Sequence, residues 1–115
     1  MGKTLAEKIL SLKSHGEAKA GDVVIADVDL AFVQDTTGPL TIRQFKESGF
    51  EALAKPQQAV VFLDHAAPSP AQQLSNDHIF LRRFAGKAGC PIYDVGEGIC
   101  HQLMAENFAN PGDVI

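Results

Sequence analysis

The stretch Ala59-Val-Val-Phe-Leu-Asp-His65 decides the fold class of this chain. Its first five residues are apolar, so an extended chain would be apolar on both faces, as in a buried strand of a parallel sheet. The run ends at once in Asp64-His65, a carboxylate beside an imidazole. Because open parallel sheets bind ligands beyond the carboxyl ends of their strands, this pair also marks a candidate site.

Two more stretches predict strands, one before and one after this run. Residues 22–35 are β-branched and apolar, which favours extended structure, and Pro91-Ile-Tyr-Asp-Val95 predicts a short third strand. An aspartate stands near the end of each predicted strand, at Asp35, Asp64 and Asp94, with separations of 29 and 30 residues. This spacing is close to the roughly 30 residues of a strand–helix–strand unit. The three strand ends are therefore expected on one edge of the sheet.

Helical patterns separate these strands. Four helices are predicted, over residues 4–13, 36–50, 69–87 and 99–108. Thr4 is the expected N-cap of the first helix, and the second is expected to have a Thr cap, Pro39 near its first turn and Gly49 as C-cap. The third is expected to have Ser69 as cap and Pro70 in its first position. Alternating strands and helices predict a three-layer α/β unit with a mainly parallel sheet flanked by helices.

The end of the chain is unusual for a natural domain. After a turn at Asn110–Asp113, the apolar residues Val114-Ile115 look like the start of another strand, with no polar tail. We therefore expect residues 1–115 to form a single partial, truncated domain. Its exposed sheet edge is expected to pair with a second copy.

Composition narrows the class of protein. The 115 residues suit one compact domain, and 45% apolar with 21% charged residues is close to the average for soluble globular proteins. A net charge of −4 argues against nucleic acid or an anionic membrane surface as partner, and no apolar run approaches the roughly 20 residues of a membrane helix. Two cysteines are too few for a disulfide scaffold and fit a reducing cytoplasm.

The adjacent residues Asp64 and His65 carry the strongest chemical signal. A carboxylate can orient an imidazole and favour its protonated form, which makes a general acid near neutral pH. The alternative is that Asp64 caps a loop or helix and His65 is a surface residue. His101 stands in the first turn of a helix after Gly96-Glu-Gly98, where the positive helix end favours anions such as carboxylates. It could equally pack against its own helix.

Other signals are weaker. The two glycines at 96 and 98 only resemble the opening of a dinucleotide fingerprint, since His101 occupies the third glycine position. Cys90 and Cys100 do not form a C-x-x-C pair, Cys90 is expected in the core, and no residues have the spacing of a metal site. The remaining histidines, His15 and His78, are expected to be structural or solvent-exposed. The arginine pair of the third predicted helix, Arg82 and Arg83, is expected on a solvated face or at a subunit contact.

Several motifs together resemble the large subunits of the aconitase superfamily. They occur in the family's order: Thr4-Leu-Ala-Glu-Lys-Ile-Leu10, Val33-Gln-Asp35, Asp64-His65, Tyr93-Asp-Val-Gly-Glu-Gly-Ile-Cys-His-Gln102 and Asn110-Pro-Gly-Asp113. The resemblance covers essentially the whole chain and is nearest to the 3-isopropylmalate dehydratase and homoaconitase type.

The resemblance implies a hydro-lyase that reversibly dehydrates hydroxy di- or tricarboxylic acids with a 4Fe-4S cluster. One iron of the cluster would bind the substrate's hydroxyl and a carboxylate. By the same resemblance, Gln34 would hydrogen-bond a substrate carboxylate and Asp64 with His65 would assist departure of the hydroxyl. His101 would sit beside the iron-bound hydroxyl or water.

The family's remaining active-site groups are expected outside these residues. They are three cysteine ligands of the cluster, a serine base and substrate-binding arginines, which belong to the rest of the large subunit and to a small swivelling subunit or domain. We therefore expect an N-terminal segment of a cytoplasmic enzyme that holds no cluster and is inactive alone.

Two other functions stay open. A non-catalytic module could bind small carboxylates or a partner subunit at the same strand edge and the helix start near Gly98. A cysteine-based redox or metal protein is disfavoured by the spacing of Cys90 and Cys100.

Overall fold

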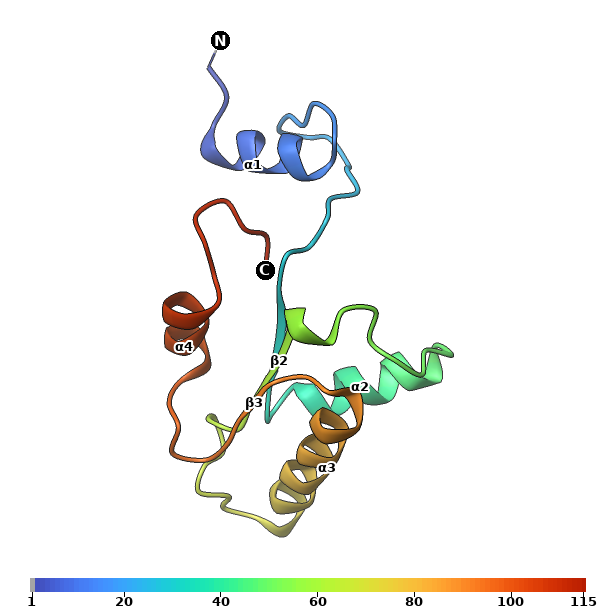
Figure 1. Cartoon of the computed structure of the whole chain (residues 1–115), viewed down its shortest axis with the longest axis vertical. Helices are drawn as coiled ribbons and strands as arrows, with labels where there is room; N and C mark the ends of the chain where they lie inside the picture. The colour runs from blue at the N-terminus through green and yellow to red at the C-terminus, as the bar shows by residue number, and fades with distance from the viewer. Residues whose placement is uncertain (1) are drawn as a thin grey trace.

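The computed structural model describes residues 2–115 and contains a three-stranded parallel sheet. Its strands are β1 (Ala31–Gln34), β2 (Ala59–Phe62) and β3 (Ile92–Tyr93), in the order β1-β2-β3 (Figure 1). Gln34 is opposite Phe62, and Phe62 is opposite Tyr93, so all three strands end at the same edge. The predicted apolar run from residue 59 is the central strand, and its residues 60–63 are buried.

Helices cover both faces of this sheet. α2 (Gly38–Glu47) and α3 (Gln72–Ala88) pack on one face, and α4 (Cys100–Asn107) packs on the other (Figure 1). A short 3-10 helix, η1 (Pro56–Gln58), leads into β2. The predicted three-layer α/β unit is confirmed. No helix within residues 2–115 is long and apolar enough to cross a bilayer.

Side-chain alternation along β2 divides the core in two. Val61 and Leu63 face α2 and α3, whereas Val60 and Phe62 face α4. The buried residues of the first cluster are Ile42, Val61, Leu63, Leu81, Ala85 and Cys90, and those of the second are Leu30, Val60, Phe62, Cys100 and Met104. Each buried residue of the central strand thus packs against one of the two helical layers.

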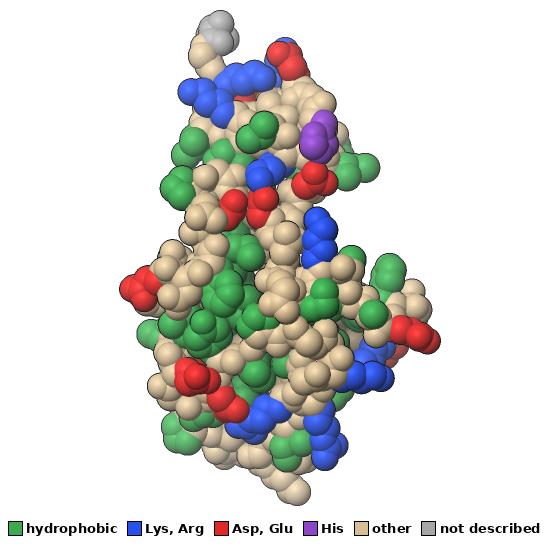
Figure 2. All heavy atoms as spheres, in the orientation of Figure 1, with side chains coloured by type: hydrophobic (Ala, Val, Ile, Leu, Met, Phe, Trp, Pro, Cys, Tyr) green, Lys and Arg blue, Asp and Glu red, His purple; other side chains and the backbone are tan. Residues whose placement is uncertain are grey.

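The helix α1 (Leu5–Lys13) stands at one end of the molecule, away from the sheet (Figure 1). Thr4 is the N-cap, as predicted, and it forms a capping box with Glu7. None of its residues is buried, and the predicted apolar positions Leu5 and Leu12 are more than two-thirds exposed. An ion pair of 2.6 Å between Lys13 and Asp29 joins it to the main body. Acidic and basic side chains gather where the molecule narrows (Figure 2).

The strands are shorter than predicted. Of the stretch 22–35 only β1 is a strand, because β2 provides hydrogen-bonding partners only from Ala31 to Gln34. Val23 and Ile25, ahead of it, are almost fully exposed. The predicted third strand contracts to two residues, and Val114 is not in a strand, although its carbonyl accepts hydrogen bonds from the amides of Asp29 and Leu30.

The predicted start of one helix is wrong, and that of another is confirmed in part. α3 begins at Gln72 after Ala71, because the Ser69 hydroxyl donates to the Ala71 carbonyl at 2.9 Å instead of accepting a helix amide. α2 has a threonine, Thr37, at its N-cap and Pro39 in its first turn, as predicted, but the Thr37 side chain makes no capping hydrogen bond. Its end agrees better with the prediction, since Gly49 has a φ of +86° just after the helix.

Candidate functional site

Strand alternation assigns the polar residues at the carboxyl edge to opposite faces of the sheet. On β1, the Phe32 ring contacts the ring of His101 of α4, with centroids 5.7 Å apart, and Gln34 shares this face. Asp35, the next residue, points to the other face and reaches His78 of α3. After β2, Asp64 follows the direction of Phe62 and faces α4. Gln34, Asp64 and His101 therefore belong to the α4 face.

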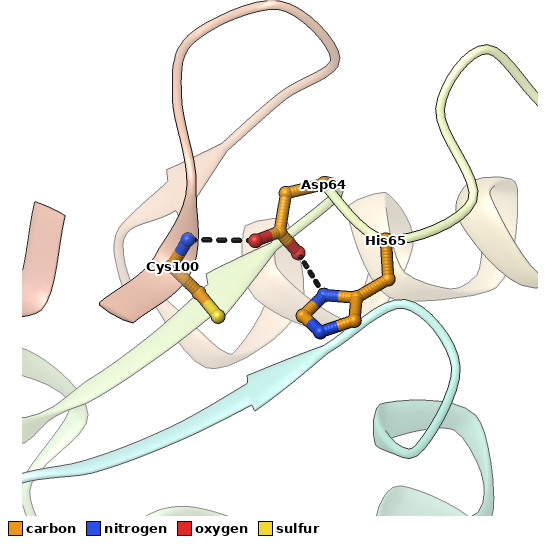
Figure 3. Close-up of side chains that lie close together, drawn as sticks. All are labelled: Asp64, His65 and Cys100. Carbon is orange, nitrogen blue, oxygen red and sulfur yellow. Dashed lines mark hydrogen bonds and ion pairs between the residues drawn. The ribbon is translucent and has the colours of Figure 1, made fainter. Parts of the chain in front are cut away.

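Asp64 and His65 form a hydrogen-bonded pair at the end of β2 (Figure 3). Nδ1 of His65 lies 2.8 Å from Oδ1 of Asp64. The Asp64 side chain is 5% exposed, whereas that of His65 is 39% exposed. With the carboxylate on Nδ1, the opposite ring nitrogen, Nε2, is the atom of His65 left to meet a ligand.

The other oxygen of Asp64 binds the start of α4 (Figure 3). The amide of Cys100, the first residue of α4, donates to Oδ2 at 2.6 Å. Burial acts to raise the pKa of Asp64, but the hydrogen bonds from the Cys100 amide and from His65 outweigh it and hold this pKa below its usual value. Asp64 therefore remains ionised at neutral pH. Asp64 caps the start of α4 and also holds the imidazole of His65, so both of the positions considered for it from the sequence, helix cap and partner of the imidazole, occur together.

Cys100 places a buried thiol beside this pair. Its Sγ lies 3.1 Å from Nδ1 of His101, and burial together with the contact to Asp64 raises the pKa of the thiol to about 11. Asp64, His65 and Cys100 offer ligand atoms within 4.8 Å of one another. A metal would need the thiolate, whereas this thiol is protonated and both oxygens of Asp64 already accept protein hydrogen bonds. The group is better described as a hydrogen-bonded network than as a metal centre.

The residues of this chain do not fit an iron–sulfur cluster. Such clusters are held by several cysteine thiolates. The chain has two cysteines, and Cys90 belongs to the core on the α2 and α3 side of the sheet whereas Cys100 belongs to the core on the α4 side. Both are buried, and burial raises the pKa of the Cys90 thiol as well. The central strand separates the two sulfurs, so they cannot serve one cluster in this arrangement.

The structure brings Asp64, His65 and His101 together, whereas Gln34, the fourth predicted site residue, lies on the same face without a direct contact to them. The rings of His65 and His101 have centroids 6.4 Å apart, and both side chains are exposed at the carboxyl edge. Gln34 lies on the same face, and its Oε1 accepts hydrogen bonds of 2.6 Å from both the amide and the hydroxyl of Thr36. With Oε1 engaged, the side-chain amide nitrogen of Gln34 is left as a donor.

The third strand-end aspartate belongs elsewhere. Asp94 accepts two hydrogen bonds of 2.7 Å from Arg82 of α3, and this guanidinium lowers the pKa of Asp94 to about 2. Arg82 and Arg83 are both exposed, in agreement with the predicted solvated face, and Arg82 is in addition paired with Asp94 within the chain. Asp94 anchors the segment after β3 and is not part of the site.

Two buried polar residues near the site, Asp35 and His78, were not among the predicted site residues. Asp35 is fully buried and His78 is 3% exposed. For Asp35 the sequence signals are its position at a strand end and its place in the Val33-Gln-Asp35 motif, whereas a histidine within a helix gives no signal. His78 is thus structural, one of the two options considered, whereas His15 is a surface residue paired with Asp27.

These features define a class of protein: a parallel α/β unit with a hydrogen-bonded carboxylate–imidazole pair and a second histidine at the carboxyl edge of its sheet. Comparison with protein families gives the more particular assignment. The model of the aconitase family (aconitate hydratase) matches residues 7–115, and the chain belongs to this family.

Similar proteins point to one branch of it. The chain is 52% identical over 115 residues to the 3-isopropylmalate dehydratase large subunit of Elusimicrobium minutum, covering all of this chain and 28% of that protein. It is 48% identical over 115 residues to the 3-isopropylmalate dehydratase large subunit 1 of Thermotoga maritima, covering 100% of this chain and 27% of that protein. It is 52% identical over 114 residues to the 3-isopropylmalate dehydratase large subunit 2 of Archaeoglobus fulgidus, covering 99% of this chain and 27% of that protein. The chain thus spans a little over a quarter of the length of these relatives.

Proposed function

We propose that this chain contributes the proton-donating part of the active site of a hydro-lyase of the 3-isopropylmalate dehydratase type. The observation that carries the proposal is the Asp64–His65 pair, with His101 beside it, at the carboxyl edge of a parallel sheet. The names of the similar large subunits supply the substrate class, a hydroxy dicarboxylic acid. Because the chain covers about 28% of such a subunit, the complete activity needs residues outside it.

His65 is the proposed general acid. Its Nδ1 is held by Asp64, so a protonated ring can donate from Nε2 to the departing hydroxyl while the carbon–oxygen bond breaks and water forms. The proton lost from the neighbouring carbon must go to a base, and the resemblance places that base, a serine, outside this chain. Asp64 fixes the direction in which the ring presents Nε2.

Gln34 is proposed to bind the substrate, and His101 is proposed to lie beside the departing hydroxyl. The free amide nitrogen of Gln34 suits a carboxylate oxygen, since its own oxygen is occupied by Thr36. His101 adds a second polar ring on the same face, packed edge-on against Phe32 and so held in place. A donor for a carboxylate beside two imidazole rings suits a substrate that carries carboxylates next to its hydroxyl.

The isolated chain is proposed to hold no 4Fe-4S cluster and to have no dehydratase activity. The family resemblance implies such a cluster in the complete enzyme, with its cysteine ligands in the rest of the large subunit. In support, Cys90 and Cys100 lie on opposite sides of the sheet. Purified residues 1–115, treated with iron and sulfide under reducing conditions, should show no cluster absorption and no turnover above background.

The proposal is tested on the complete large subunit that contains this chain, combined with its small subunit. Dehydration of 3-isopropylmalate, homocitrate and citrate is followed separately by the ultraviolet absorbance of the unsaturated product. We expect activity on 3-isopropylmalate, and a fall in kcat of about 10²- to 10⁴-fold in His65→Gln. His15→Gln is the matched control, because His15 also pairs with an aspartate, Asp27 at 2.8 Å, but lies at the far end of the molecule near α1.

Two results would contradict the proposal. One is an unchanged kcat in His65→Gln, which would remove the general acid from this chain. The other is the absence of turnover with every hydroxy acid tested in a complete, cluster-loaded protein, which would favour the non-catalytic carboxylate-binding module.

A further inference from the structure

Asp35 is a buried carboxylate with three hydrogen-bond donors around it. The amide of His65 donates to its Oδ1 at 2.9 Å, and the amide of Ala66 donates to its Oδ2 at 2.9 Å. Nε2 of His78, on α3, lies 2.9 Å from the same Oδ2. The carboxylate thus links the end of β1, the loop after β2 and helix α3 over separations of 30, 31 and 43 residues.

The charge of this group is satisfied inside the protein. Burial acts to raise the pKa of Asp35, but the Ala66 and His65 amides and the His78 ring outweigh it, so the pKa lies below its usual value. An ionised carboxylate only accepts hydrogen bonds, so Nε2 of His78 carries the hydrogen. Hydrogen bonds to a charged, buried acceptor are among the stronger ones in proteins.

The amides that Asp35 binds belong to the loop that carries the proposed general acid. β2 ends at Phe62, so the amides of His65 and Ala66 lie beyond the strand and take their partner from Asp35. Asp35 lies on the α3 side of the sheet and binds the backbone of His65, whereas Asp64 binds the ring of His65 from the α4 side. Backbone and ring of one residue are therefore held from two sides.

We infer that Asp35 and His78 are positioning residues that fix the backbone of His65 and Ala66, so that the imidazole of His65 keeps its orientation toward the α4 face. This inference deepens the proposed function and rests on it for its catalytic consequence. Asp35 also follows Gln34 directly, so the same carboxylate places the proposed substrate-binding residue relative to the general acid. His78 acts one step further away, by holding the carboxylate in line with the two amides.

The first arm of the test needs no catalysis. Amide hydrogen exchange is measured by NMR in the natural protein and in the His78→Leu variant. The internal reference is the Val61 amide, which donates to the Pro91 carbonyl at 3.0 Å between β2 and β3. We expect the His65 and Ala66 amides to exchange about tenfold faster or more relative to Val61. His78→Gln, whose side-chain amide can donate in place of the ring, should restore much of the protection.

Leu81→Ala is the matched control, since Leu81 is a fully buried residue of the same helix in the α2 and α3 core. It should destabilise the protein without a selective effect on the two amides. Asp35→Asn is a second variant that keeps the size of the side chain and removes its charge, and it should give the same selective increase as His78→Leu. Exchange that rises equally at Val61, His65 and Ala66 in both Asp35 and His78 variants would overturn the inference.

The second arm uses the complete enzyme below the melting temperature of each variant. In His78→Leu we expect kcat to fall about tenfold or more, with KM changed less than about threefold. The kcat of His78→Gln should recover in part, and the kcat of Leu81→Ala should change little. Selective exchange with an unchanged kcat would overturn the catalytic part. If the complete protein has no hydro-lyase activity, the proposed function fails, whereas the exchange arm still decides the positioning of His65.

Discussion

The amide of Cys100 donates to Oδ2 of Asp64 at 2.6 Å, across 36 residues of sequence. Ile99, at the N-cap position of α4, makes no side-chain capping hydrogen bond, so this contact satisfies a first-turn amide of the helix from another element. It also places a negative charge at the positive end of α4. The residue proposed to orient His65 therefore attaches α4 to the end of β2.

This relationship predicts that Asp64→Ala destabilises the protein by about 1–2 kcal/mol, the typical cost of losing a helix cap. Asp64→Asn should cost less, because it retains an oxygen that can accept from the Cys100 amide. Urea unfolding followed by far-ultraviolet circular dichroism at pH 7 compares the three proteins. An equal cost for the two variants would show that the charge and not the hydrogen bond matters at this position.

The Asp94–Arg82 pair predicts a stability that depends on acid pH. The pKa of Asp94 is about 2 in the folded protein, below its usual value of 3.8, so the stabilisation is present above about pH 4 and is lost as the pH falls toward 2. Both side chains are more than one-third exposed, and solvent screening limits the contribution to about 1 kcal/mol. The difference in unfolding free energy between the natural protein and Arg82→Gln should shrink between pH 6 and pH 2.5; a constant difference would contradict the ion pair.

The two thiols are predicted to be unreactive in the folded protein. With a pKa of about 11, the Cys100 thiol is ionised roughly 100-fold less at pH 8 than an ordinary thiol, and its burial slows the reaction further. Cys90 is buried and has a raised pKa as well. Titration with an aromatic disulfide reagent should therefore be slow without denaturant and fast in urea. Rapid reaction of Cys100 in a Cys90→Ala variant under native conditions would indicate an open or ionised thiol.

Two positions on α3 separate packing from helix propensity. Leu81→Ala is predicted to cost about 3 kcal/mol, because Leu81 is fully buried in the core beneath α2 and α3. Ile79→Ala, two residues earlier and 43% exposed, should change the stability by less than about 1 kcal/mol, since Ala also favours helix. Thermal and urea unfolding test both variants. Similar losses at the two positions would contradict the assignment of the buried face.

The layers of the fold were predictable because their causes are local. The continuous apolar run from Ala59 to Leu63 and the helical spacings on either side of it are properties of neighbouring residues, and they predicted β2, α3 and α4 to within a few residues. The ends of the elements were less predictable. The length of β1 depends on the partners that β2 provides, and the start of α3 depends on Ser69 bonding to Ala71 within its loop.

For the site, the sequence by itself determined that a carboxylate and an imidazole would stand side by side at the end of a buried strand, because Asp64 and His65 are covalent neighbours after an apolar run. Only the tertiary structure decided that the start of α4 returns to Asp64, and that Asp35 meets His78 over 43 residues. The physical reason is that strand alternation sends Asp35 and Asp64 to opposite faces of the sheet. Each buried carboxylate must then find donors on its own face, and besides the loop after β2 these include His78 of α3 for Asp35 and the Cys100 amide of α4 for Asp64.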